Sequence, residues 1–147
     1  MEIPAIGLEW VVHEPTVESD EPFNIAKSEL DQWGIVIFPH YAYPGEIGVV
    51  VLAGHRDMSG APFWRLDELK EGDEIKISLQ GDYPILMYRV FDLRYVEPDD
   101  LSILKPINEG VQELRLITCL IGSQRQRVVV FAKIPEERRH QWDTAYP

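Results

Sequence analysis

The chain has 147 residues, of which 45% are hydrophobic and 10% aromatic, enough to form the core of one ordinary domain and too many for a disordered chain. Its formal net charge of −11 at pH 7 argues against general binding to nucleic acids or to anionic membranes, which require a basic surface. Its single cysteine excludes an internal disulfide and a structural zinc site built from clustered thiolates.

Short apolar runs rich in β-branched residues occur along most of the chain, separated by turn residues. They predict strands at 8–12, 34–38, 47–54, 73–79, 85–96, 113–119 and 127–134. Polar and apolar residues alternate within the fourth and fifth of these runs, as in strands with one buried face. Seven or more short strands at this spacing are typical of a β-sandwich or a β-barrel.

Two segments between the strands are predicted to be short helices. In the first, 61–73, Phe63, Leu66 and Leu69 recur at every third residue and would share one face. The second, 97–106, has a proline near its start, acidic residues in its first turn and a proline at its end. Both helices are expected to cover the ends of a barrel.

The only cysteine, Cys119, ends the run 113–119, and Arg127 opens the next apolar run. Two consecutive strands with a short connection most simply form an antiparallel pair, which would bring Arg127 close to Cys119. A guanidinium group beside a thiol favours the reactive thiolate, and it can also hold a carbonyl oxygen as that oxygen becomes an oxyanion. Arg125 would face the same way and is the competing candidate, because sequence alone does not fix the register.

Four histidines are available for acid–base chemistry: His13, His40, His55 and His140. His55 directly follows the strand-like run 47–54, where a rigid strand gives way to a loop, a common setting for functional sites. The alternative for His55 is a surface histidine at a strand end. The other three lie in predicted loops or in the charged tail, and solvent-exposed, non-catalytic roles are expected for them. No pair has the i, i+4 spacing of a helical zinc motif, and no metal is predicted.

The segments LAGHRD (52–57), FWRLDELKEGDEI (63–75), LITC (116–119) and RVVVFA (127–132) occur in this order and at this approximate spacing in sortases. The chain resembles that family over about residues 3–134. The resemblance implies a mainly β fold, a closed eight-stranded β-barrel with one or two short helices. It also implies a cysteine transpeptidase that cleaves a Leu-Pro-x-Thr-Gly-like sorting signal after its threonine and transfers the acyl group to an amine.

By motif position, the resemblance assigns the catalytic roles to His55, Cys119 and Arg127. Cys119 would attack as a thiolate, His55 would exchange protons with the leaving and incoming amines, and Arg127 would hold the substrate and the oxyanion. Further substrate contacts are expected from residues of the strands that carry His55 and Cys119: Ala53, Ile117 and Thr118. Arg115 departs from the small polar residue that many members have at its position. The sequence most resembles the smaller non-housekeeping classes.

The partners implied are a sorting-motif peptide of surface proteins or pilins and an amine acceptor, either a cell-wall peptide or a lysine. No cofactor, metal or nucleic acid is expected. Residues 1–134 would form the catalytic domain, and the charged tail 135–147 would be flexible or a short helix. Family members normally carry an N-terminal membrane anchor, whereas no apolar run here approaches the ~20 residues that span a bilayer. The chain is therefore expected to be a soluble form of a protein of the extracellular membrane face.

Three alternatives to the transpeptidase are considered. A hydrolase would use the same chemistry and release its acyl-enzyme to water. A β-barrel module that has lost activity would only bind extended peptides, although the intact set of His55, Cys119 and Arg127 argues against such a loss. A metal-binding protein built from scattered His and Asp residues is the least favoured, because no metal-ligand spacing is present.

Overall fold

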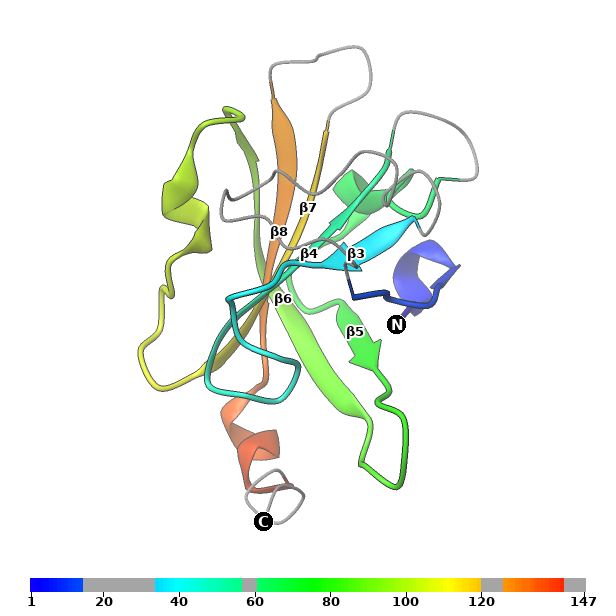
Figure 1. Cartoon of the computed structure of the whole chain (residues 1–147), viewed down its shortest axis with the longest axis vertical. Helices are drawn as coiled ribbons and strands as arrows, with labels where there is room; N and C mark the ends of the chain where they lie inside the picture. The colour runs from blue at the N-terminus through cyan, green and yellow to red at the C-terminus, as the bar shows by residue number, and fades with distance from the viewer. Residues whose placement is uncertain (15–33, 57–60, 120–125, 142–147) are drawn as a thin grey trace.

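The computed structural model describes residues 1–14, 34–56, 61–119 and 126–141. An eight-stranded sheet forms the body of the molecule, in the order β2-β1-β5-β6-β8-β7-β4-β3 (Figure 1). The strands are β1 (Glu2–Ile3), β2 (Leu8–Glu9), β3 (Ile35–Ile37), β4 (Gly48–Gly54), β5 (Glu74–Ile77), β6 (Leu86–Val96), β7 (Gln112–Cys119) and β8 (Arg127–Lys133). The described helical segments are short 3-10 turns: η1 (Pro4–Ile6), η2 (Leu66–Glu68), η3 (Leu101–Leu104) and η4 (Glu136–Gln141).

All seven predicted strands are confirmed, although the first is shorter than expected. The run 8–12 forms a strand only at Leu8–Glu9, and its later residues continue toward β3 without forming a ladder. The strand β1 was not predicted, because two residues are too few to show an alternating pattern.

The two predicted helices are present only as the 3-10 turns η2 and η3. Phe63, Leu66 and Leu69 are buried on one face as predicted, but their three-residue spacing matches the 3.0 residues per turn of a 3-10 helix better than the α-helical 3.6. In the second segment the turn begins after Asp100, whose carboxylate accepts a hydrogen bond from the Ser102 amide at 3.0 Å.

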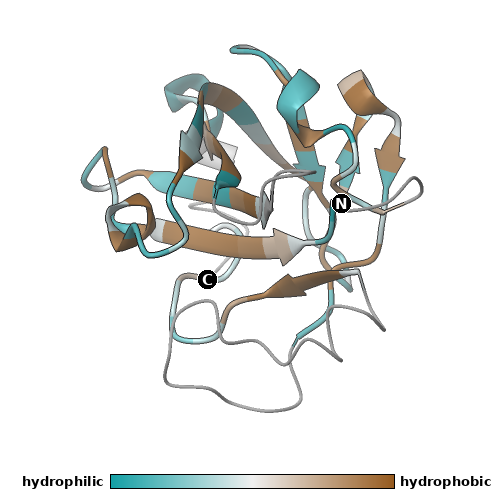
Figure 2. Ribbon diagram, turned by 90° about the horizontal axis from the view of Figure 1, so that it is seen from above, coloured by the Kyte–Doolittle hydropathy of each residue, from teal (hydrophilic) through white to brown (hydrophobic). Residues whose placement is uncertain are grey.

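Both faces of the central strands are buried, which explains their nearly continuous apolar sequences. The inner cluster, on the concave face, includes Val50 and Leu52 of β4, Leu114 and Leu116 of β7, and Val128 and Val130 of β8. The outer cluster includes Val49, Val51, Ala53, Ile117, Val129 and Phe131, covered by Ile103 and Leu104 of η3. Figure 2 shows several strands coloured as hydrophobic over most of their length.

Three neighbouring strands of the sheet begin or end at the same end of the molecule. β4 and β7 are parallel and end at Gly54 and Cys119, whereas β8 runs antiparallel to β7 and begins at Arg127. The predicted antiparallel pairing of 113–119 with 127–134 is therefore confirmed. On its other side β8 pairs with β6, which carries an irregularity between Val90 and Asp92.

The closed barrel expected from the sequence is not confirmed. The described residues form a curled, open sheet whose two edge strands are β2 and β3. A single isolated bridge links this seam between the edges: the His13 amide donates to the Ile35 carbonyl, and the Ile37 amide donates to the His13 carbonyl, each at 3.0 Å. Within the described parts of the chain, no helix has the length and apolar character needed to cross a membrane.

Candidate functional site

The sheet topology brings the three predicted catalytic positions together at the ends of three neighbouring strands, β4, β7 and β8. The parallel register pairs Ala53 of β4 with Ile117 of β7, so the chain leaving β4 brings His55 alongside Cys119. The antiparallel register pairs Cys119 directly with Arg127. We call these three positions the site row, with Cys119 on the strand between the other two.

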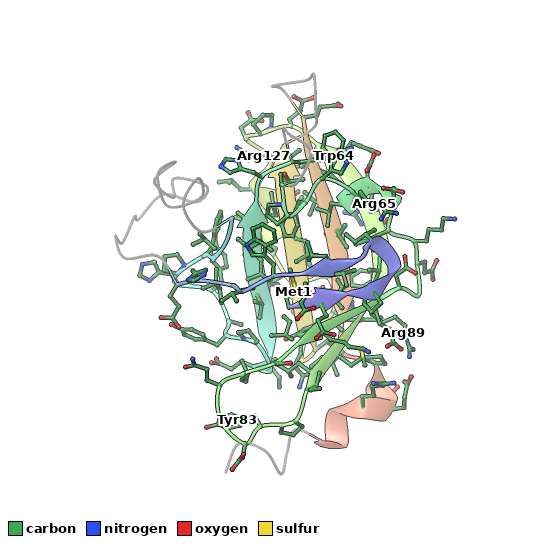
Figure 3. The ribbon with its side chains drawn as sticks, turned by 90° about the vertical axis from the view of Figure 1, so that its right-hand side faces the viewer. Met1, Trp64, Arg65, Tyr83, Arg89 and Arg127 are labelled. Carbon is green, nitrogen blue, oxygen red and sulfur yellow. The ribbon has the colours of Figure 1, made fainter. Side chains whose placement is uncertain are left out.

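Strand alternation assigns all three positions of the site row to the outer face of the sheet. Ala53 and Ile117 belong to the outer cluster, and His55 and Cys119 each follow them by two residues. Arg127 precedes the outer residue Val129 by two residues and lies opposite Cys119 in the ladder, which gives it the same face. Figure 3 shows Arg127 at the same end of the molecule as Trp64, with Tyr83 at the opposite end.

The register also bears on the choice between the two candidate arginines. Arg127 is half-buried and is the position paired with Cys119. Arg125 lies outside the described residues, as does the side chain of Cys119. His13 forms its backbone bridge beside Val36 of β3, whereas His40 lies in the loop after β3 and His140 lies in η4.

The backbone at His55 is held by tight packing around Gly54. A Cβ at Gly54 would lie 2.7 Å from the Phe63 ring and 3.1 Å from the Gly34 carbonyl oxygen, so a larger residue does not fit without displacement. The Phe63 amide in turn donates to the His55 carbonyl at 3.0 Å. The core residue Phe63 therefore fixes the point at which the chain leaves β4.

Arg56 is a buried charge next to His55 that the sequence analysis did not single out. It is 8% exposed, its Nη2 lies 2.8 Å from the Asp67 carboxylate, and its Nε donates to the Trp64 carbonyl at 3.4 Å. These contacts tie the end of β4 to η2. The signal in the sequence was the arginine directly after the histidine, in the segment that resembled sortases.

The three predicted substrate-contact residues do not share a face. Ala53 and Ile117 lie side by side on the outer face, each two residues before the site-row position that follows it in the chain. Thr118 alternates to the inner face, opposite Val128, and its Oγ1 is buried without a hydrogen-bond partner among the described residues. Ile117 is 1% exposed because η3 packs over this part of the sheet.

A buried ion pair lies on the outer face of β7, further from the site row than Ile117. Glu113 and Arg115 are both 0% exposed, and Arg115 Nη2 lies 3.0 Å from Glu113 Oε1. Burial lowers the pKa of Arg115, and the Glu113 carboxylate works against that shift. Among the described residues, no group of three or more His, Cys, Asp or Glu side chains is placed to hold a metal ion.

The protein is therefore a β protein with a candidate thiol site. Its sheet is curled and mixed, and its cysteine, histidine and arginine positions form one row at the ends of three neighbouring strands. The Sortase domain family matches residues 1–135, and the chain belongs to the sortase family.

Individual relatives agree with this assignment. The chain is 31% identical to Sortase D of Bacillus subtilis (strain 168), over 90% of this chain and 61% of the relative, so it spans less than two thirds of that protein. A solved Clostridium perfringens Sortase D5 transpeptidase is similar with a TM-score of 0.72 and 29% identity, over 91% of this chain and 76% of the other. A lid mutant of Sortase A from Corynebacterium diphtheriae gives a TM-score of 0.75 and 28% identity, over 91% and 67%.

Proposed function

We propose that the protein is a cysteine transpeptidase that cleaves a sorting-signal peptide of the Leu-Pro-x-Thr-Gly type and transfers the acyl fragment to an amine. The observation that carries this proposal is the site row. In a family of cysteine transpeptidases, this chain has its only cysteine paired with Arg127 on one side and flanked by His55 on the other.

Each residue of the site row has one chemical role. The Cys119 thiolate attacks the carbonyl carbon of the Thr-Gly bond, and Arg127 stabilises the negative charge that develops on the carbonyl oxygen. His55, as an imidazolium, protonates the leaving amine as the C–N bond breaks and a thioester forms. An incoming amine then attacks the thioester, His55 takes its proton, and the Cys119 thiolate leaves.

Ala53 and Ile117 are proposed to form the floor of the peptide groove. Their support is their position beside the site row on the same face. Thr118 would contribute through its backbone next to the nucleophile, because alternation turns its side chain to the inner face. η3 covers Ile117, so Ile117 can contact substrate only where η3 forms the adjoining wall of the groove.

The natural substrates are proposed to be surface proteins or pilins, with a cell-wall peptide or lysine as the acceptor amine. The protein would then act at the extracellular face of the cell membrane. The similarity to Sortase D supports one of the smaller non-housekeeping classes. Residues 1–134 would be the catalytic domain, followed by the charged tail 135–147, and closure of the seam between β2 and β3 would complete the barrel.

Mass spectrometry of a sorting-motif peptide incubated with the protein and a candidate amine tests the proposal. We expect an amine-exchanged product, and a thioester adduct on Cys119 when the amine is left out. Cys119→Ala and His55→Ala should each abolish turnover while keeping the wild-type far-UV circular dichroism spectrum. A free threonine acid as the sole product would instead identify a hydrolase. An unchanged peptide across a motif library, with binding retained, would identify an inactive peptide-binding module.

A further inference from the structure

The loop between β6 and β7 is attached to β7 by two fully buried charged side chains. Glu113 and Arg115 are two residues apart on β7, and both belong to the outer face. Arg115 is among the largest fully buried side chains of the described residues. Burying a charge costs free energy unless its hydrogen bonds are made. The hydrogen bonds of this pair therefore identify the backbone groups that the two side chains hold in place.

The guanidinium group of Arg115 holds the first part of the loop. Its Nε donates to the Ile103 carbonyl at 2.8 Å, and its Nη2 donates to the Lys105 carbonyl at 3.1 Å. The same plane lies over the Phe131 ring at 4.4 Å from the ring centroid. The planar fork thus joins two carbonyls of the loop to the outer face of β8.

The carboxylate of Glu113 holds the second part of the loop. Oε2 accepts hydrogen bonds from the Ile107 and Asn108 amides, each at 2.9 Å, and Oε1 accepts from Arg115 at 3.0 Å. The pair therefore satisfies carbonyls on one side of Pro106 and amides on the other. Together the two side chains fix the path of 103–108 across the outer face.

That path places the loop next to the candidate site. Ile103 and Leu104 pack in the outer cluster with Ala53 and Ile117. Arg115 is four residues before Cys119 on the same strand and face, a spacing of about 13 Å along a strand. A peptide held at Cys119 on the outer face would therefore meet this loop where the loop covers β7.

We propose that Glu113 and Arg115 are positioning residues, which fix loop 103–108 as the wall of the peptide groove and so set the affinity for the sorting peptide. The inference rests on the proposed function for its substrate. Buried ion pairs contribute little net stability compared with apolar residues of similar volume, so stability alone does not explain a pair at this position. What the pair supplies is geometry, because the rigid guanidinium group holds both carbonyls at a fixed separation while it also pairs with Glu113.

The test compares Arg115→Lys with Arg94→Lys. Arg94 is the matched control: it also lies over the Phe131 ring, at 4.5 Å, but it is half exposed and pairs with Asp92 rather than with the loop. Lysine keeps the positive charge beside Glu113 but replaces the separate Nε and Nη2 donors of the rigid guanidinium group with one flexible ammonium group. We expect Arg115→Lys to raise the KM for the motif peptide about tenfold, with kcat within about threefold of wild type. Arg94→Lys should leave both unchanged.

Two further measurements do not depend on turnover. In Arg115→Lys, hydrogen exchange at the Ile107 and Asn108 amides should be at least about tenfold faster, with exchange in β7 and β8 unchanged. Alkylation of Cys119 by iodoacetamide should proceed at the wild-type rate, because the reagent is too small to need the groove wall. Glu113→Gln, which retains one acceptor oxygen, should show a smaller effect on the same two amides.

The outcomes separate this inference from the proposed function. Wild-type KM and wild-type loop exchange in Arg115→Lys would overturn it, and so would equal losses in Arg94→Lys. If Arg115→Lys fails to fold, Glu113→Gln decides by the same readouts. If the wild-type protein turns over no peptide, the proposed function fails, whereas the exchange of Ile107 and Asn108 still shows whether the pair holds the loop.

Discussion

At the residue scale, substitution of Arg127, the arginine paired with Cys119, distinguishes between the two candidate catalytic arginines. Arg127→Lys keeps the positive charge but replaces the planar fork with a point donor, which cannot hold the substrate and the oxyanion in one fixed geometry. We expect kcat/KM for a sorting-motif peptide to fall by about 10²–10³-fold, measured by steady-state kinetics, with an unchanged unfolding midpoint. Arg125→Ala should retain most activity. Near-full activity of Arg127→Lys together with a dead Arg125→Ala would mean that the other arginine serves the site.

Candidate positions for the site could be named from the sequence more readily than their surroundings. His55 and Cys119 could be singled out because one directly follows a strand-like run and the other ends one, and such positions are readable from local pattern. The choice of Arg127 over Arg125 needed the register, which depends on long-range pairing. The burial of Arg115 was not predictable, because its partners Ile103 and Lys105 belong to another segment and a lone arginine in a strand is ordinarily exposed.

At the element scale, the end of β4 packs closely against the Phe63 ring because Gly54 has no side chain. Gly54→Ala would place a methyl group 2.7 Å from the Phe63 ring, which is fully buried and has little room to move. We expect a loss of about 1–3 kcal/mol in the free energy of unfolding, measured by urea denaturation. Activity should also fall, because the Phe63 amide binds the His55 carbonyl.

Phe63→Leu is the partner variant for this prediction. Removing part of the ring should make room for the added methyl group, so Gly54→Ala should cost less in the Phe63→Leu background than in the wild type. Strictly additive costs would show that the contact between these two residues is not the reason for glycine at this position.

Strands were predicted better than helices for a physical reason. β5 and the first half of β6 show the alternation of a strand with one buried face, and β4 and β8 are short apolar runs rich in β-branched residues. The segment around η2 has apolar residues at every third position, a spacing compatible with both α-helices and 3-10 turns. The segment around η3 was predicted from its prolines and acidic residues, which mark helix ends without fixing the helix type. Their actual form is set by tertiary contacts, such as the packing of Leu66 in the inner cluster and of Ile103 in the outer one.

At the scale of the whole molecule, one isolated bridge joins the seam between the edge strands in the described part of the sheet. Two backbone hydrogen bonds at His13 connect it. His13→Pro removes the amide that donates to the Ile35 carbonyl, whereas His13→Ala keeps both bonds. We expect His13→Pro to unfold at least about 1 kcal/mol more easily than His13→Ala, with faster hydrogen exchange at the Ile37 amide. Equal stability of the two variants would show that the bridge does not hold the seam.

Barrel closure is the feature of the whole molecule that the sequence could not decide. Closure depends on whether β2 and β3 meet, and the chain between them includes 15–33, which lies outside the described residues. The alternating pattern of a strand is the same whether its free edge faces solvent or another strand. The curled sheet could therefore be predicted from its strands, while the state of its edges could not.

The parallel pairing of β4 with β7 has a consequence for biosynthesis. Parallel neighbours cannot be joined by a tight turn, and here β5, β6 and η3 intervene before β7 is reached. β8 comes last, so a nascent polypeptide emerging from the ribosome carries the histidine first, the thiol much later and the arginine last of all. A polypeptide that ends before residue 127 therefore lacks the arginine position, and the site row cannot be complete until β8 has been made.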